Sequence, residues 1–185
     1  IMKTHDMAQI SIFAVLSAVG ARIMVPLPLV PFTLQTLVCM MAGMVLGSKK
    51  GAASQALYML MGLIGIPVFT GGGGPASVLT PSFGYIAGFV ACGWATGHII
   101  ELRSKDSEPT RRDYLIAAAA GIAAVYSIGL IHLYMIMNFF MPGNGMPLMK
   151  VLSVGFLSTI GGDAIKAFIA ASAAMKLKRT GIFKN

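Results

Sequence analysis

The stretch YLIAAAAGIAAVYSIGLIHLYMIMNFF, residues 114–140, decides the fold class of this protein. It contains no Asp, Glu, Lys or Arg, and it is longer than the roughly 20 apolar residues that a helix needs to cross a bilayer. The rest of the chain has the same character: 56% of its 185 residues are hydrophobic and only 11% are charged, with a mean hydropathy of +0.79. The sequence therefore predicts an all-α integral membrane protein.

Six apolar runs predict six transmembrane helices in one bundle that comprises residues 1–185 as a single domain. The runs cover about 8–25, 32–46, 52–65, 83–100, 114–140 and 149–175. Pro26, Pro28 and Pro31 end the first run, Gly47–Gly51 turns the chain after the second, and Pro67–Pro81 separates the third from the fourth. The second and third runs are short for complete spans, so we expect these helices to be tilted, broken or partly re-entrant.

The positive charges predict how this bundle is oriented. Most of them lie before the first run, between the second and third, between the fourth and fifth, and after the sixth: Lys3; Lys49 and Lys50; Arg103, Lys105, Arg111 and Arg112; Lys176, Lys178, Arg179 and Lys184. The other three loops, 26–31, 66–82 and 141–148, contain no charged residue. By the positive-inside rule, the cationic loops and both termini are cytoplasmic. Because the cations are scattered over several loops, the net charge of +8 reflects topology, and a nucleic-acid partner is not expected.

Asp163 and Lys166 break this pattern, because they lie within the last apolar run. Thr159, Asp163 and Lys166 are spaced i, i+4 and i+7, so they share one face of a helix, and Gly155 and Gly162 beside them allow close approach. An ionised carboxylate at bilayer depth costs about 2.5–3.5 kcal/mol on insertion scales, so it normally faces a partner, a polar cavity or a ligand. A purely structural ion pair is the alternative.

The charge balance of the outer half favours an anionic ligand. Three cations, Lys166, Arg22 and Lys150, accompany a single acid, Asp163. Snorkelling of Arg22 and Lys150 to the outer membrane interface is the alternative reading of those two residues.

A stripe of small residues in the first run predicts close helix packing. Ala14-x-x-x-Ala18 lies at its centre. Packing within this bundle and docking to another subunit are both compatible with the motif.

No residue pattern predicts a metal site, a bound cofactor or catalysis. Cys39 and Cys92 lack a paired spacing, and the three histidines lie on different segments without companion ligands. The glycine run 71–74 is not followed by Gly-Lys-Ser/Thr, so a nucleotide-binding loop is not expected. This long uncharged loop is either a flexible connector or a lid over a ligand site.

Several of these motifs together resemble BioY, the family of biotin-binding substrate-capture subunits (S components) of energy-coupling-factor (ECF) vitamin transporters. The resemblance covers nearly the full length of the chain. It rests on VPFTLQT at 30–36, Gly47–Gly51, Tyr58, GLIGIPVF at 62–69 with the glycines that follow, Pro81, Gly84-Tyr85, and Gly162-Asp163-x-x-Lys166.

The resemblance implies a site for biotin, which has a ureido ring, an apolar thiophane ring and a carboxylate tail. Asp163 would accept hydrogen bonds from the ureido N–H groups, and Lys166 would orient it and support the ureido carbonyl. Gln35 and Thr33 would add polar contacts near the outer mouth.

The other implied contacts enclose the rings and the tail of biotin. Phe69 and Tyr85 would flank the rings, and the loop that carries Gly73 and Gly74 would cover them. The carboxylate would meet one of two cations, Arg22 or Lys150.

The resemblance also implies partners, because the chain has no ATPase motif of its own. These are a transmembrane coupling protein, which would dock on the Ala14 and Ala18 face, and two cytosolic ATPase subunits, all at the bacterial cytoplasmic membrane. Three alternatives remain: an S component for another small anionic vitamin, a stand-alone secondary transporter, which calls for ionisable relays and an internal repeat, and an intramembrane enzyme, which calls for a nucleophile with a base or a metal.

Overall fold

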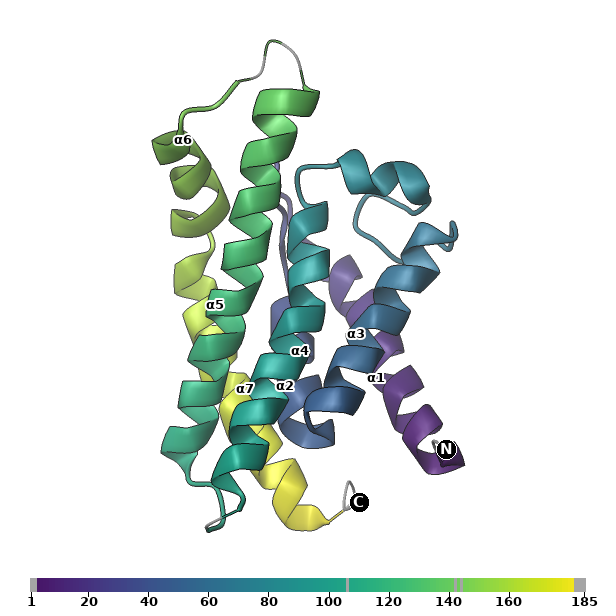
Figure 1. Cartoon of the computed structure of the whole chain (residues 1–185), viewed down its shortest axis with the longest axis vertical. Helices are drawn as coiled ribbons and strands as arrows, with labels where there is room; N and C mark the ends of the chain where they lie inside the picture. The colour runs from purple at the N-terminus through teal and green to yellow at the C-terminus, as the bar shows by residue number, and fades with distance from the viewer. Residues whose placement is uncertain (1–2, 106, 142, 144, 182–185) are drawn as a thin grey trace.

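A computed structural model describes residues 3–105, 107–141, 143 and 145–181 and shows a bundle of helices (Figure 1). The helices are α1 (Thr4–Arg22), α2 (Gln35–Leu46), α3 (Ser48–Leu63), α4 (Phe83–Arg103), α5 (Arg111–Met135, continued by a π-helical turn, Ile136–Phe140), α6 (Leu148–Leu152, continued by a π-helical turn, Ser153–Leu157) and α7 (Ile160–Thr180). Two short strands, β1 (Met24–Val25) and β2 (Phe32–Thr33), and a 3₁₀ helix, Pro75–Leu79, complete the described part. With α6 and α7 counted as one interrupted helix, the predicted six-helix, all-α architecture is confirmed.

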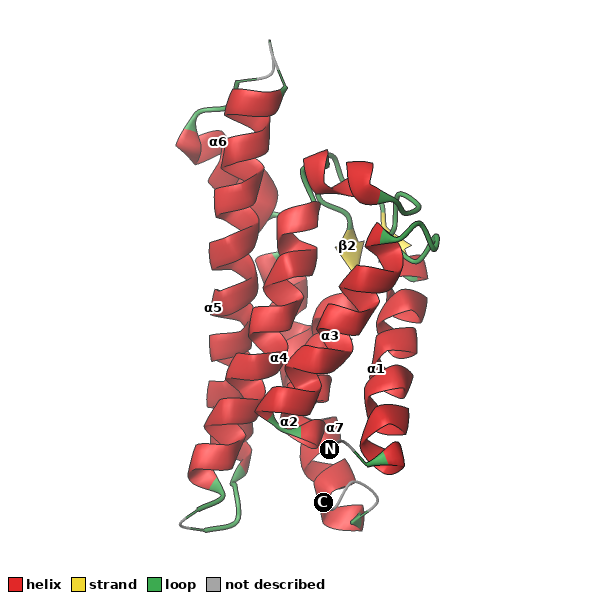
Figure 2. Ribbon diagram, turned by 45° about the vertical axis from the view of Figure 1, so that its right-hand side comes forward, coloured by secondary structure: helices red, strands yellow, loops and turns green. Residues whose placement is uncertain are grey.

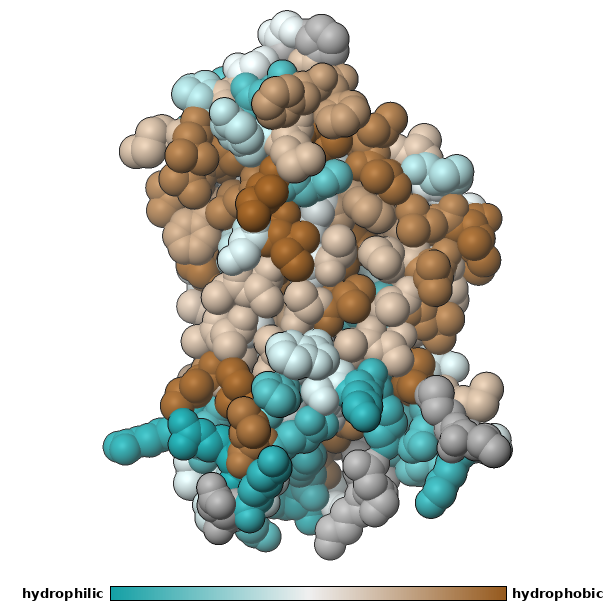
Figure 3. Space-filling view, in the orientation of Figure 1, coloured by the Kyte–Doolittle hydropathy of each residue, from teal (hydrophilic) through white to brown (hydrophobic). Residues whose placement is uncertain are grey.

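Three of the described helices are long and apolar enough to cross a membrane: Phe83–Arg103, Arg111–Phe140 and Leu148–Thr180. α2 is apolar but shorter, and α3 runs obliquely to α5 (Figure 2). Hydrophilic side chains gather at the end of the bundle where α1 begins and α7 ends, and hydrophobic ones cover the middle (Figure 3). This distribution is that of a membrane protein, and the assignment of the hydrophilic end to the cytoplasm stays a prediction.

The connection between the first two helices differs from the prediction. The first helix ends at Arg22 and not at 25, and the second begins at Gln35 and not at 32, because β1 and β2 pair antiparallel between them. Val25 precedes a proline, which disfavours helical backbone and favours an extended one. The hairpin lies at the end of the bundle opposite to the start of α1, beside the loop 64–82 (Figure 2).

The third helix begins earlier than predicted, at Ser48 and not at 52. The Glu101 carboxylate of α4 accepts hydrogen bonds from the Ser48 backbone N–H and hydroxyl, both at 2.7 Å. This interaction satisfies donors at the start of α3. The predicted turn 47–51 is thereby reduced to Gly47, whose φ of +88° suits glycine.

The last apolar run, predicted as one helix over about 149–175, contains a break in the structure. The regular helix is interrupted at Ser158 and Thr159, of which Thr159 departs from helical backbone angles with φ of −120°, and α7 begins at Ile160. Gly161 and Gly162, which have low helix propensity, follow the break. Asp163 consequently lies in the first turn of α7, where the helix dipole stabilises a carboxylate.

Glycines bring α2, α3 and α4 into backbone contact. A methyl group added at Gly51 would lie 2.6 Å from the Gly43 Cα and 2.9 Å from the Gly93 carbonyl oxygen. One added at Gly93 would lie 2.8 Å from the Gly51 carbonyl group. The three helices therefore meet where no side chain fits, as is typical of membrane helix interfaces.

The Gly93→Ala substitution is expected to lower the free energy of unfolding by about 1–3 kcal/mol, because overpacking forces α3 and α4 apart. Thermal unfolding of the purified protein in detergent measures this effect. Gly161→Ala is the matched control, since a methyl group there meets open space. An unchanged melting temperature for Gly93→Ala would contradict the packing described above.

Candidate functional site

A narrow cavity lies between the hairpin, the loop 64–82 and helices α2, α4, α5 and α7. About 500 Å³ of space not filled by atoms belongs to it, part of which is open. Its walls combine polar and aromatic side chains. Polar side chains come from Thr33, Gln35, Thr36, Thr159, Asp163 and Lys166, and aromatic ones from Phe32, Tyr85, Phe89 and Tyr126. Such a combination of apolar walls and a few convergent polar groups is typical of a small-molecule site.

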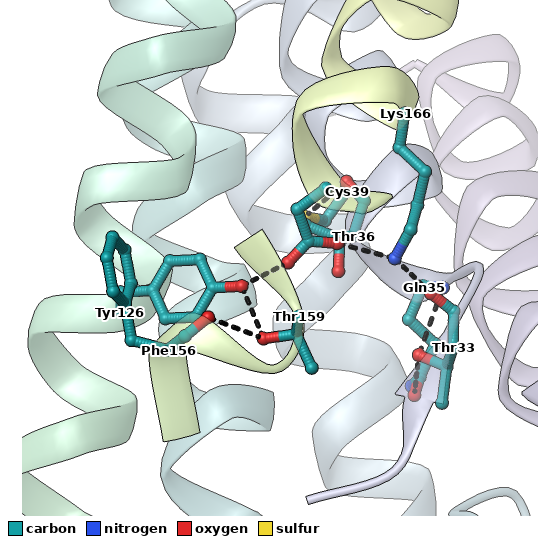
Figure 4. Close-up of polar contacts among 9 residues, drawn as sticks. Thr33, Gln35, Thr36, Cys39, Tyr126, Phe156, Thr159 and Lys166 are labelled. Atoms are coloured by element: carbon teal, nitrogen blue, oxygen red, sulfur yellow. Dashed lines mark hydrogen bonds and ion pairs between the residues drawn. The ribbon is translucent and has the colours of Figure 1, made fainter. Parts of the chain in front are cut away.

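Asp163 and Lys166 form a buried ion pair in the cavity wall. The Lys166 Nζ lies 2.5 Å from Asp163 Oδ1, and the two residues are 5% and 4% exposed. The ammonium also donates a hydrogen bond of 2.6 Å to the Thr33 carbonyl and lies 3.6 Å from the centre of the Phe32 ring. Both charges thus face protein and the cavity, not lipid, and the amine joins α7 to β2 (Figure 4).

The second oxygen of Asp163 is held by a tyrosine that sequence reasoning missed. Tyr126 of α5 donates a 2.5 Å hydrogen bond to Asp163 Oδ2, and the Thr159 hydroxyl lies 2.7 Å from the Tyr126 oxygen (Figure 4). Among the described residues, Asp163 Oδ1 has its ion pair but no hydrogen bond, so it retains capacity to accept one. A buried tyrosine hydroxyl usually has a hydrogen-bond partner. The position of Tyr126 in the middle of an apolar run was therefore the feature of the sequence that could have identified it as a site residue.

A chain of side-chain hydrogen bonds holds the opposite wall in place. The Thr33 hydroxyl donates to Gln35 Oε1 at 3.0 Å, and Gln35 Nε2 donates to the Tyr58 oxygen at 2.7 Å. The Tyr58 hydroxyl in turn donates to the Val68 carbonyl at 3.2 Å, which ties this wall to the loop 64–82. Thr33 and Gln35 therefore line the cavity on rigid supports.

The sequence profile of the BioY family matches residues 1–182 of this chain. The chain belongs to the BioY family. The probable biotin transporter BioY of Lysinibacillus sphaericus is 38% identical over 95% of this chain and 87% of the relative. The biotin transporter BioY of Thermotoga maritima is 34% identical over 95% of this chain and 96% of the relative.

A solved structure supports the same assignment. The crystal structure of the S-component for biotin from an ECF-type ABC transporter superposes with a TM-score of 0.84 at 29% sequence identity, covering 100% of this chain and 98% of that one. The resemblance of the sequence to the BioY family is thereby confirmed, and the relatives are named transporters, not enzymes.

Of the two aromatic residues expected at this BioY-family site, only Tyr85 lines the cavity. Its hydroxyl donates to the Gly155 carbonyl at 2.9 Å, and its ring meets Tyr126 edge to face at 6.1 Å. Phe69 is 3% exposed and packs edge to face against Tyr58 and Phe83, with ring centres 5.5 and 6.3 Å away. Phe69 therefore packs under the loop 64–82 and does not line the cavity, whereas its neighbour in sequence, Thr70, does.

The remaining predicted residues lie outside the cavity. Gly74 donates its N–H to the Gly62 carbonyl at 2.7 Å, and Gly73 is packed against the Ile66 carbonyl, so both fix the loop to the end of α3. The Arg22 guanidinium donates to the Pro67 carbonyl. Lys150 is exposed near the start of α6. Within the described part of the chain, Lys166 is the one cation in the cavity wall, so ligand contacts by Arg22 and Lys150 stay predictions.

The small-residue stripe of α1 packs within this BioY-family bundle. Ala14 is fully buried and Ala18 is partly buried, and nearby the Ser17 hydroxyl donates to Gln55 of α3 at 3.0 Å. In this conformation Ala14 offers no surface to another subunit, and a docking role for the stripe stays a prediction.

Proposed function

We propose that this chain is the S component of an ECF transporter, which captures biotin from outside the cell with high affinity. The observation that carries the proposal is the cavity lined by the Asp163–Lys166 pair, in a fold that matches a solved S-component for biotin. The protein would reside in the bacterial cytoplasmic membrane with the hydrophilic end of Figure 3, and both termini, in the cytoplasm.

The polar groups of the cavity match the ureido ring. Asp163 Oδ1 can accept from a ureido N–H, because its only described contact is the Lys166 ammonium. That ammonium has three donors and can turn one of them to the ureido carbonyl. Thr33 and Gln35, which line the same cavity, would add polar contacts.

The aromatic residues of the cavity suit the thiophane ring and the carbon chain. Tyr85, Tyr126, Phe32 and Phe89 all line it. The loop that carries Gly73 and Gly74 would act as the cover. The carboxylate would then extend towards the outer end, where Arg22 could meet it only after releasing the Pro67 carbonyl.

Transport would require partners that supply energy. We assign this role to one transmembrane coupling protein and two cytosolic ATPase subunits, since the chain itself carries no Walker motif. No resident cofactor or metal is part of the proposal.

The proposal is tested by titrating the detergent-purified chain with biotin, riboflavin and thiamine in separate experiments. We expect saturable binding of biotin alone. Saturable binding of another vitamin in place of biotin would assign the cavity to that vitamin, and binding of none would remove the proposal.

Tyr126→Phe is expected to weaken biotin binding about tenfold, because the Asp163 carboxylate loses a charge-assisted hydrogen bond. Isothermal titration calorimetry measures the change. Tyr134→Phe removes the same hydroxyl from an exposed tyrosine of the same helix and should bind as the parent does. Equal affinities for both variants and the parent would exclude a positioning role for Tyr126.

A further inference from the structure

A second, larger cavity lies at the hydrophilic end of the bundle. It is formed by the start of α1, the α2–α3 turn and the end of α4, and about 1420 Å³ of space not filled by atoms belongs to it, part of which is open solvent. It shares no described lining residue with the biotin cavity. The proposed function does not use it.

The described wall carries three lysines, Lys3, Lys49 and Lys50, against two acids, Asp6 and Glu101. Glu101 is held by the two Ser48 donors at 2.7 Å, and Asp6 is held by Lys50 Nζ at 3.0 Å. Within the described residues, the exposed ammonium groups of Lys3 and Lys49 have no ion-pair partner. Asp6 is thus paired with a cation, and both Glu101 oxygens are already hydrogen-bonded although its negative charge remains. Lys3 and Lys49 stay available to an anion.

The floor of the cavity is apolar. Ile10 and Leu46 are 5% and 4% exposed, and Ala53 is partly buried beside them. Next to this floor, Gln9 accepts a hydrogen bond from Lys50 through Oε1 at 3.3 Å, while its buried Nε2 has no partner in the described structure. A basic rim above an apolar floor fits a molecule with an anionic head and a hydrocarbon tail.

We propose that this cavity binds an anionic phospholipid, with the phosphate between Lys3 and Lys49 and part of an acyl chain against Ile10, Leu46 and Ala53. Basic pockets between membrane helices at the cytoplasmic side are suited to such headgroups. The apolar floor favours a lipid over a free phosphate, because a soluble anion would gain nothing from it. The lipid would fill the space between α1 and α3 at the membrane surface and stabilise this end of the bundle.

Native mass spectrometry of the full chain in mild detergent tests the proposal, with added dioleoyl phosphatidylglycerol, dioleoyl phosphatidylcholine or glycerol 3-phosphate. We expect one phosphatidylglycerol to be retained per chain in preference to phosphatidylcholine. In the double variant Lys3→Gln/Lys49→Gln this preference should fall about thirty-fold, since each lysine near an anionic lipid contributes roughly fivefold.

Lys105→Gln/Arg112→Gln is the matched control, because it removes two exposed cations, one after the end of α4 and one in the first turn of α5, that do not line this cavity. It should retain the lipid preference of the parent. If both double variants lost the preference for phosphatidylglycerol equally, the preference would arise from the overall surface charge and not from this cavity, which would overturn the proposal. If glycerol 3-phosphate bound as tightly as the lipid, the site would be one for a soluble phosphate. If the parent retained neither lipid, the cavity would be open to a protein segment instead. Either result overturns the proposal.

Biotin titration of the same variants separates this inference from the proposed function. Among the described residues the two cavities have no lining residue in common, so both double variants should bind biotin as the parent does. A failure of the parent to bind biotin would remove the transport proposal and leave the lipid measurement intact.

Discussion

Replacing Asp163 by asparagine is expected to lower the affinity for biotin by about two to three orders of magnitude, which is the cost of losing two hydrogen bonds to a charged group. The asparagine side chain has one carbonyl oxygen where the carboxylate has two, and it carries no charge. In the described part of the structure, one carboxylate oxygen is held by Tyr126, and the other is paired with Lys166 and has no further partner. The amide therefore offers an acceptor at only one of these two oxygen positions and places an NH2 donor at the other, and neither position carries charge.

The loss of charge has a second consequence. Lys166 is 4% exposed, and without Asp163 its ammonium keeps the Thr33 carbonyl and the Phe32 ring but no counter-ion. A buried unpaired charge is unfavourable, so part of the loss would appear as a lower melting temperature. Biotin titration of folded protein separates the two effects. An affinity within a few-fold of the parent would remove Asp163 from the ureido site.

Lys166→Met is expected to destabilise the protein by about 3–5 kcal/mol, because it breaks a buried ion pair and leaves the Asp163 carboxylate without its cation. Methionine retains most of the aliphatic length of lysine but removes the ammonium that lies over the Phe32 ring. The change is measured by thermal unfolding in detergent without biotin. A melting temperature equal to that of the parent would mean that the pair contributes nothing to the fold.

The double variant Asp163→Asn/Lys166→Met decides between a structural and a ligand-binding role for the pair. Removing both charges together eliminates the unpaired ion, so we expect the stability to recover most of the loss seen in Lys166→Met. Biotin binding should not recover, because the ureido ring would still lack its charged acceptor. Recovery of both properties would show that the pair serves only the fold.

The sequence was sufficient to locate the pair but not to describe its surroundings. Asp163 and Lys166 stand out because charges are rare in apolar runs, and their spacing places them on one face of a helix. Their partners come from distant parts of the chain: Tyr126 is 37 residues from Asp163, and Thr33 is 133 residues from Lys166. No local pattern links such positions.

Arg22, Lys150 and Phe69 also show that the sequence alone does not determine which residues line the cavity. Charge counting placed both cations in the outer half, yet Arg22 holds the Pro67 carbonyl and Lys150 is exposed. Phe69 belongs to a motif that resembles the family, but the fold of its loop turns the ring away from the cavity and against Tyr58. Which side of a loop faces a ligand depends on backbone turns that residue types alone do not determine.

The amino-acid sequence by itself determined that this protein is a membrane-embedded bundle of six helices and that its last helix carries an unusual acid and amine. These properties follow from the cost of placing polar groups in hydrocarbon, which depends only on the local composition of each segment. The tertiary structure alone decided the break before α7, the hairpin over the cavity, and the approach of Cys39 to Cys92, whose sulfur atoms lie 3.2 Å apart on α2 and α4. These features arise from how helices pack against one another, and that packing is set by contacts between residues far apart in the chain.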